Sequence, residues 1–359
     1  MGKCRELRQQ LAAEKPRRDE RLNFPEPSDS IARVLSLQRT LAMITQCQHS
    51  SAKRNGHDRH GNQRFKCRDC GVSFAAPRPR PIGTMRIEIN RAASVLQMLL
   101  EGMSIRAAER ISRFDHRTIT QLMVEAGERC KLFLEDTLIG LPVDDLECDE
   151  IWDFVGCKER TRERMEKGDQ CGDAYCFTAI EANTKLLVAW HLGKRTDDHT
   201  LEFAGKVSRA TAGRFQLSTD GYTPYRTAVP AAFGGRVDFA QVVKVYGTAA
   251  DQHRYSPGEV VETRKHVRHG DPDEDRICTS HAERHNLSIR MHVRRLTRLT
   301  NAFSKKWENH EAMLALFFMF YNYCRPHMSL ARRTPAMAAG LTCRVWSIRK
   351  LLDETATQS

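Results

Sequence analysis

Hydrophobic side chains recur with two different spacings along the chain, and the change between them predicts where helices give way to strands. Between residues 87 and 131 the apolar positions follow a helical spacing that is interrupted twice, so three short helices are expected. Ser104 and Asp115 precede the second and third helices, where short polar side chains cap free backbone N–H groups. Residues 86–140 therefore have the rhythm of a helix-turn-helix domain, with a plain helical connector as the alternative.

From Leu146 onward the pattern is typical of a mixed α/β domain. Its three consecutive strands are expected at 146–156, 174–181 and 185–192. Helices and strands then alternate up to residue 246, which predicts a mixed five-stranded sheet covered by helices, in the order of a ribonuclease-H-like fold. Residues 247–278 are polar and rich in turn formers, so a mobile insertion is expected there. The long helices that follow are expected at 281–301 and 308–323.

Changes in composition divide the rest of the chain. Residues 1–45 are polar and charged and are expected to form an arm with little order. Residues 46–76 contain a Cys-x-x-Cys pair and several histidines, which predicts a small zinc-ribbon-like module. Residues 77–85 begin with alternating proline and arginine and suit an extended linker. The α/β domain is expected to span 141–345, followed by a C-terminal tail, 346–359.

The charge balance favours a polyanionic partner. The 359 residues include 57 Lys and Arg against 45 Asp and Glu, for a formal net charge of +12, which is compatible with binding to nucleic acid. No run reaches the roughly 20 apolar residues that span a bilayer, and the first residues are polar. We therefore expect no membrane partner and a cytoplasmic, nucleoid-associated protein. The 12 cysteines are then expected to be thiols or metal ligands.

Three acidic residues stand where a carboxylate is informative. Asp149 lies within an apolar strand, where an unpaired charge would be costly to bury. Asp220 closes a second apolar strand, and functional sites gather at the carboxyl ends of such strands, although an Asp-Gly turn would explain it as well. Glu283 opens a helix, where a solvated acid stabilised by the helix dipole is the simple explanation. Converging carboxylates are what two-metal phosphoryl transfer requires.

The sequence motifs around these acids resemble those in the transposases of bacterial insertion sequences of the insertion-sequence-one family. The matching words are Glu147-Cys148-Asp149-Glu150-Ile151-Trp152, Thr219-Asp220-Gly221 and Glu283-Arg284-His285-Asn286-Leu287, which occur in the order of the family's DDE domain. Further similar words are Gly193-Lys194-Arg195-Thr196, Phe303-Ser304-Lys305 and Tyr321-Asn322-Tyr323. The resemblance implies that Asp149, Asp220 and Glu283 are catalytic and bind Mg²⁺ or Mn²⁺.

The resemblance also implies a zinc site before residue 76. Its second half is similar to the family's ribbon at Cys67 and Cys70, whereas the first half departs from the usual Cys-x-x-Cys and offers Cys47 and His49. These four side chains suit a tetrahedral Zn²⁺ site. His57 or His60 could replace one of the ligands in the first half of the ribbon. The alternative is a ribbon that no longer binds metal.

The expected partner is DNA, both the terminal repeats of the element and the target. The last helix of the helix-turn-helix would present Arg117, Thr118 and Thr120 to DNA, and Arg290 and Arg294 would steady the DNA backbone beyond Glu283. The resemblance implies a DNA transposase that works as a homodimer or higher oligomer. A hydrolytic nuclease or resolvase of the same fold, or a domesticated DNA-binding protein without catalysis, are the alternatives.

Overall fold

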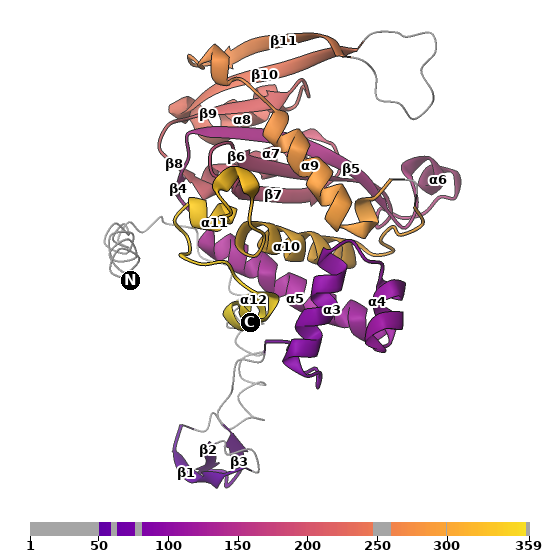
Figure 1. The fold of residues 1–359 in the computed structure, drawn as a ribbon, viewed down its shortest axis with the longest axis vertical. Coiled ribbons are helices and arrows are strands. Elements are labelled where there is room, and N and C mark those ends of the chain that lie inside the picture. The colour runs from indigo at the N-terminus through magenta and orange to yellow at the C-terminus, as the bar shows by residue number, and fades with distance from the viewer. Residues whose placement is uncertain (1–49, 59–62, 76–80, 247–259, 299, 357–359) are drawn as a thin grey trace, which may run out of the picture. The chain divides into compact units, whose positions relative to one another are not determined.

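A computed structural model describes residues 50–58, 63–75, 81–246, 260–298 and 300–356, which form two compact units. The first unit contains a three-stranded antiparallel sheet (Figure 1), made of β1 (Ala52–His57), β2 (Gln63–Cys67) and β3 (Ser73–Ala75). A tight turn follows β2, because Cys67 N–H donates to Val72 O (2.9 Å) and Gly71 N–H donates to Cys67 O (3.1 Å). Gly71 has a φ of +74°, a conformation that glycine adopts without strain.

The second unit is built on one six-stranded sheet whose order is β11-β10-β9-β5-β6-β7 (Figure 1). Its strands are β5 (Asp145–Val155), β6 (Gly172–Glu181), β7 (Leu187–Gly193), β9 (Phe215–Asp220), β10 (Val237–Tyr246) and β11 (Val260–His269). β5, β6 and β7 form an antiparallel meander, β9 lies parallel to β5, and β10 lies parallel to β9. The mixed α/β class and the expected meander are confirmed.

The number of strands differs from the sequence prediction. β11 pairs antiparallel with β10 and lies in the segment that was expected to be a mobile insertion, so the sheet has a sixth strand in place of the expected five. β11 is an edge strand, and nearly all of its side chains are exposed on both faces. A strand without a buried face carries no alternation of apolar and polar residues, so its composition resembles that of a loop.

Helices cover both faces of the sheet. The helices of this unit are α3 (Ile89–Leu100), α4 (Ile105–Ser112), α5 (His116–Thr137), α6 (Glu159–Arg164), α7 (Asp197–Ala210), α8 (Tyr225–Phe233), α9 (Ser280–His292), α10 (Trp307–Tyr323), α11 (Pro335–Ala338) and α12 (Ile348–Thr355). Neighbouring residues of β7 show the two sides, because Trp190 packs on Phe318 of α10 while His191 packs on His199 of α7. Successive strand residues point to opposite faces, so α7 and α10 cover different faces.

The helical segment before the sheet shares its core with the sheet. Ser104 and Asp115 cap α4 and α5 as expected, since their side chains accept hydrogen bonds from Ala107 N–H and Arg117 N–H. α5 is much longer than expected because its buried face continues against α10. The two helices approach so closely that a Cβ on Gly127 would lie 2.1 Å from Ala312 O. Buried side chains of α3, α5, α10, α12 and the sheet form one hydrophobic cluster.

Two further segments differ from the expected pattern. α9 ends at His292, well before the expected end at residue 301, and a short 3-10 helix, Arg294–Leu296, follows it. The expected C-terminal tail includes α12, whose Leu351 and Leu352 are fully buried. Among the described residues, every helix is too short or too polar to cross a bilayer.

A buried polar network fastens the segment after α9 to the core. The Arg295 guanidinium donates to Ser304 Oγ (3.3 Å), and Ser304 Oγ lies 2.9 Å from Nδ1 of His310. The Nε2 atom of His310 is 3.7 Å from a carboxylate oxygen of Asp153 on β5. Burial lowers the pKa of His310 to about 3 and raises that of Asp153 to about 7, although the Phe154 N–H, Arg290 and Arg295 oppose the latter shift. The core therefore favours the uncharged form of both groups.

This network predicts a pH-dependent effect of Asp153→Asn. Since the pKa of Asp153 is raised on folding, its contribution to stability is full below the unfolded pKa of about 3.9 and is lost as the pH rises through about 7. The amide cannot ionise. Urea unfolding at a series of pH values should show the stability of the variant rising relative to wild type between pH 4 and pH 8, by on the order of a few kcal/mol. A difference that is constant with pH would contradict this assignment.

Candidate active site

Asp149, Asp220 and Glu283 come from three elements that meet at one side of the sheet. Asp149 lies in the middle of β5 and Asp220 is the last residue of β9. The parallel register pairs Cys148 with Thr219, which makes the two aspartates neighbours. Glu283 lies in the first turn of α9, and Asn286, one turn later, donates from Nδ2 to Asp149 Oδ2 (2.8 Å). The structure thus makes Asp149 and Asp220 neighbours, and the charge of Glu283 acts on both, although the Glu283 carboxylate itself pairs with Lys244.

The carboxylate of Glu147 fixes the position of α9. It lies two residues before Asp149 on the same face of β5, and its side chain is only 4% exposed. It accepts hydrogen bonds from the backbone N–H of His281 (2.7 Å) and of Ala282 (3.1 Å), and lies 2.6 Å from His281 Nδ1. A buried carboxylate at a helix N-terminus satisfies free N–H groups and complements the helix dipole. The same strand therefore carries one acid of the site and holds the helix that carries another.

Repulsion among the carboxylates shapes their ionisation. Burial raises the pKa of Asp149 to about 7, and the nearby charges of Asp220 and Glu283 add to this shift. Burial also raises the pKa of Asp220, while its hydrogen bond from Tyr222 N–H and the charge of Arg195 oppose the shift. Oxygen ligands that repel one another in this way fit a hard divalent cation, which removes the repulsion. The donor set could therefore hold a divalent metal ion.

Two cationic side chains reach the acids from the surrounding elements. Lys244 of β10 pairs with Glu283, which also accepts a hydrogen bond from Thr279 Oγ1 (2.9 Å). The Arg195 guanidinium stacks on Tyr222, 4.0 Å from the ring centre, and its Nη2 lies 3.6 Å from Asp220 Oδ2. Arg195 belongs to the word 193–196 that resembles the family, although the sequence did not indicate its role.

Glu150 is a fourth acid of the site that sequence reasoning missed. Its side chain is 2% exposed and accepts hydrogen bonds from Arg195 Nε (3.3 Å) and Nη2 (3.2 Å). Burial and the charge of Asp220 raise its pKa to about 8. Oxygens of Asp149, Glu150 and Asp220 all lie within 4.8 Å of one another. Adjacent strand residues point to opposite faces, and Asp220, at the end of β9, is close to both Asp149 and Glu150. The only signal for Glu150 in the sequence is its position next to Asp149 in the same motif.

The expected DNA-binding residues have different environments. Arg117 is exposed at the start of α5, whereas Thr118 and Thr120 are half-buried, and Thr120 Oγ1 donates to His116 O (2.8 Å). Arg290 is half-buried and donates to the backbone carbonyls of Leu296 (2.9 Å) and Trp152 (3.4 Å), so its contacts tie α9 to β5.

Thr120 and Arg294 line the same cavity, about 640 Å³ in volume, between the α4–α5 region and the segment after α9. Arg106 and Lys305 also line this cavity. The α4–α5 region and the segment after α9 therefore share one basic hollow.

The expected zinc ligands are only half described. Cys67 is 1% exposed and Cys70 is exposed at the turn after β2, so the two thiols of the Cys-x-x-Cys pair flank one tight turn. His57 is exposed on β1. The expected partners Cys47 and His49, and the substitute His60, lie outside the described residues.

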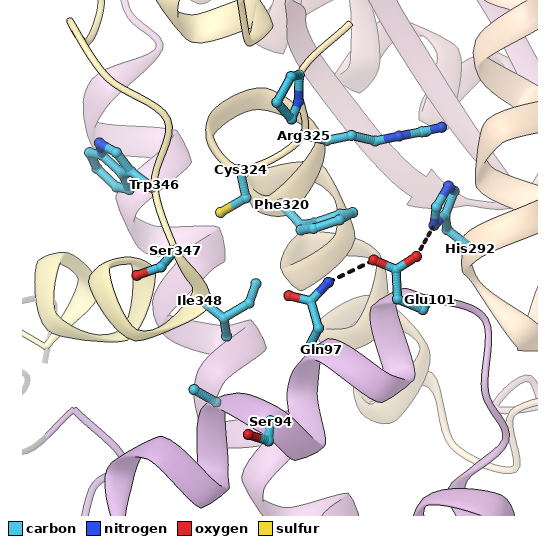
Figure 2. Close-up of a pocket in the computed structure, with 12 residues that line it drawn as sticks. Ser94, Gln97, Glu101, His292, Phe320, Cys324, Arg325, Trp346, Ser347 and Ile348 are labelled. Carbon is cyan, nitrogen blue, oxygen red and sulfur yellow. Dashed lines mark hydrogen bonds and ion pairs between the residues drawn. The ribbon is translucent and has the colours of Figure 1, made fainter. Parts of the chain in front are cut away.

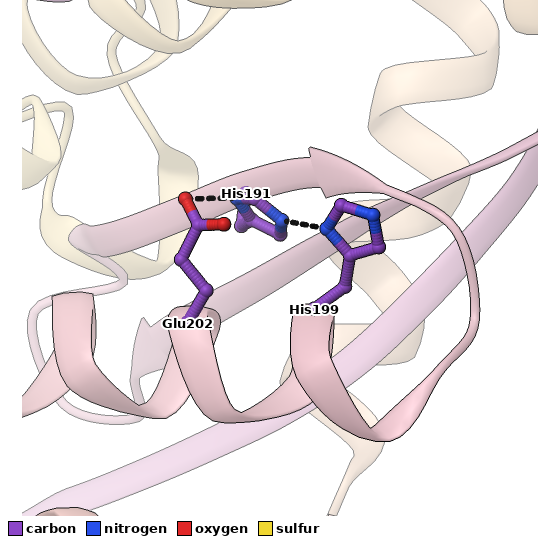
Figure 3. A group of neighbouring side chains, drawn as sticks. All are labelled: His191, His199 and Glu202. Carbon is purple, nitrogen blue, oxygen red and sulfur yellow. Dashed lines mark hydrogen bonds and ion pairs between the residues drawn. The ribbon is translucent and has the colours of Figure 1, made fainter. Parts of the chain in front are cut away.

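Two other polar features lie apart from the acids. A cavity of about 670 Å³ (Figure 2) is lined by residues of α3, α10 and α12, and its Glu101 pairs with His292 at 3.9 Å. None of the three acids lines it. Figure 3 shows His191 between His199 (2.9 Å) and Glu202 (3.3 Å). These three side chains have the types of metal ligands, but the Lys206 ammonium lies 3.1 Å from His191 Nδ1, and a cation there already partners the imidazole.

The geometry defines an acidic site on a mixed sheet that could hold a metal ion. Comparison with known proteins shows which proteins the chain resembles. Residues 255–324, which include Glu283 and α10, match the family model described as IS1 transposase. The chain is 25% identical over 178 residues, 49% of its length, to the insertion element iso-IS1n protein InsB of Shigella dysenteriae, and covers 96% of that protein. This chain is thus related to the insertion-sequence transposases of the IS1 family, which confirms the resemblance indicated by its motifs.

A solved structure gives a more distant match. A piggyBac transposase synaptic complex with hairpin DNA is 10% identical, with 75% of this chain and 70% of that chain covered and a TM-score of 0.34. A likeness of that degree carries no argument about this fold.

The position of Glu147 predicts that Glu147→Gln loosens α9. The amide loses the charge that strengthens the bonds to His281 and Ala282, and removing a charge-assisted partner costs about 2 to 3 kcal/mol. Amide hydrogen exchange should become faster throughout α9. Glu181→Gln is the matched control, because Glu181 is also buried and accepts bonds from Asn183 and Thr184, at the turn between β6 and β7. Equal rates of amide hydrogen exchange in α9 of the two variants would show that Glu147 does not hold this helix.

Proposed function

We propose that this protein is a DNA transposase that cleaves the ends of its element and joins them to target DNA. The observation that carries the proposal is the convergence of Asp149, Asp220 and Glu283 on one side of a mixed sheet, within a chain related to IS1-family transposases. The order of β5, β6, β7, β9 and β10 supports a ribonuclease-H-like catalytic core.

In this proposal the carboxylates of Asp149, Asp220 and Glu283 would hold two Mg²⁺ ions. Bound Mg²⁺ lowers the pKa of an attacking water or 3′-hydroxyl and stabilises the leaving oxygen. Asn286 and the Glu150 N–H orient the Asp149 carboxylate through bonds of 2.8 Å each. Arg195 and Lys244 offset the negative charge of the acids and are placed to face a phosphate that approaches them.

The remaining parts of the chain would serve DNA recognition. Arg117, Thr118 and Thr120 would face the terminal repeats, and the cavity that Thr120 shares with Arg294 would receive the backbone of the same DNA. Because two element ends must be joined to one target, we propose a homodimer or larger assembly on DNA, at the nucleoid in the cytoplasm.

The triad predicts the outcome of three amide variants. Asp149→Asn, Asp220→Asn and Glu283→Gln should each lower both strand cleavage and strand transfer at least a hundredfold, because the amide keeps the shape but lacks the anionic oxygen that Mg²⁺ requires. Mapping the junctions formed by purified protein, Mg²⁺, element ends and a supercoiled target measures both steps. Binding to the element ends should persist.

Asp353→Asn is the control for this experiment, since Asp353 pairs with Arg349 on the surface of α12. Normal transposition by Glu283→Gln would show that the third acid has been misassigned. Cleavage without strand transfer by the wild-type protein would favour a hydrolytic nuclease or resolvase.

We also propose that the first unit binds zinc through Cys67, Cys70, Cys47 and His49. Thiolate coordination supplies much of the folding energy of a small ribbon, so Cys67→Ser should release the metal and unfold the ribbon while the second unit stays folded. Elemental analysis should find about one zinc per wild-type chain. Cys343→Ser, which removes an exposed thiol of the second unit, should keep it. Wild-type protein that contains no zinc after purification would contradict the proposal.

A further inference from the structure

Two arginines converge on one buried amide beside the loop that follows Asp220. Arg226 of α8 donates from Nε to Gln241 Oε1 (3.1 Å), and Arg268 of β11 donates from Nε to the same oxygen (3.0 Å). Gln241 is fully buried in β10, whereas both arginines are exposed. A guanidinium has five N–H donors, and these bonds use only one from each arginine. Among the described residues no acceptor takes the other donors, so they can bind a ligand at the surface.

No acid among the described residues compensates the charge of this pair. Within the part of the chain that the structure describes, neither arginine forms an ion pair, and their shared acceptor is a neutral amide. Burial first, and then the charge of Arg226, lowers the pKa of Arg268, so the two cations repel each other. Neighbouring arginines differ, since Arg264 pairs with Glu262 at 2.8 Å and Arg214 pairs with Asp238. An anion with several oxygens would relieve the repulsion of the pair.

The same amide connects the arginines to the active site. Gln241 Nε2 donates to the backbone oxygens of Asp220 (2.9 Å) and Tyr222 (3.1 Å). Gln241 faces α8, while Lys244, three residues later on β10, reaches Glu283 on the other face of the sheet. The arginine pair and the acids therefore lie on either side of the strand end that carries Asp220.

We propose that Arg226 and Arg268 bind a phosphodiester group of a DNA strand that passes the catalytic acids, and that Gln241 holds the two guanidiniums together for this purpose. A phosphate presents paired oxygens that match the planar fork of arginine. The site rests on the proposed function, because its ligand is the DNA on which the acids act. It would place a part of the strand away from the scissile bond, so its contribution is to binding and orientation.

The test measures binding without chemistry. Full-length protein without added Mg²⁺ or Mn²⁺ is titrated into a fluorescein-labelled DNA duplex of arbitrary sequence at several salt concentrations, and anisotropy gives Kd. Arg226→Gln with Arg268→Gln should weaken binding roughly tenfold and lower the magnitude of the slope of log K against log salt by about 1, because the pair neutralises one phosphate. Arg226→Lys with Arg268→Lys keeps the charges and should restore most of the slope.

The matched control removes two arginines that already have acidic partners. Arg214→Gln with Arg264→Gln makes the same change in formal charge and should weaken binding less than about twofold. An equal loss in this control would show a general effect of charge and overturn the site, as would wild-type affinity in the double glutamine variant of Arg226 and Arg268. The binding assay contains no Mg²⁺ and therefore does not depend on cleavage. A wild-type protein that binds DNA in this assay but does not cleave element ends when Mg²⁺ is added would refute the proposed function and leave this site standing.

Discussion

The buried carboxylate of Glu147 is the contact on which the geometry of the acids depends. Asp149 and Asp220 are placed by hydrogen bonding between adjacent strands, so the sheet alone fixes their relation. Glu283 belongs to a helix far along the chain and has no such constraint. Glu147 anchors the first turn of that helix to β5, and Asn286 adds a second bond one turn later. A helix held at two points on one strand can neither slide nor rotate freely against it.

Bringing the carboxylates together in a partly buried site costs free energy, and cations on both faces of the sheet offset this cost. Placing carboxylates in a partly buried site raises their pKa and disfavours their charged forms. On the α9 face, Lys244 reaches Glu283, and on the α8 face, Arg195 reaches Glu150 and Asp220. These cations come from strands and loops of the same sheet. The charge balance of the acids is therefore built into the scaffold.

Sequence reasoning succeeded where burial leaves a periodic signal. The meander of β5, β6 and β7 and the caps Ser104 and Asp115 follow from local pattern, and Asp149 and Asp220 stood out because each interrupts or ends an apolar strand. Glu283 could be chosen only through the family resemblance, since an acid in a first helical turn is ordinary. Glu147 and Glu150 were missed because their roles depend on His281 and Arg195, which are distant in the sequence. No local pattern distinguishes a solvated glutamate from one that caps a remote helix.

The exposed strand β11 is a second case in which the local sequence pattern does not predict the structure. Its sequence is polar because both of its faces meet solvent, and its place in the sheet comes only from the free hydrogen-bonding edge of β10. An edge strand with charged side chains resists pairing with another sheet, which explains why lysine and arginine are tolerated along it. One of those arginines, Arg268, bends back to Gln241 beside Asp220. The sheet therefore holds the positive charge of β11 next to the acids. The segment whose composition suggested a loop is a strand that extends the surface on which a polyanion can lie.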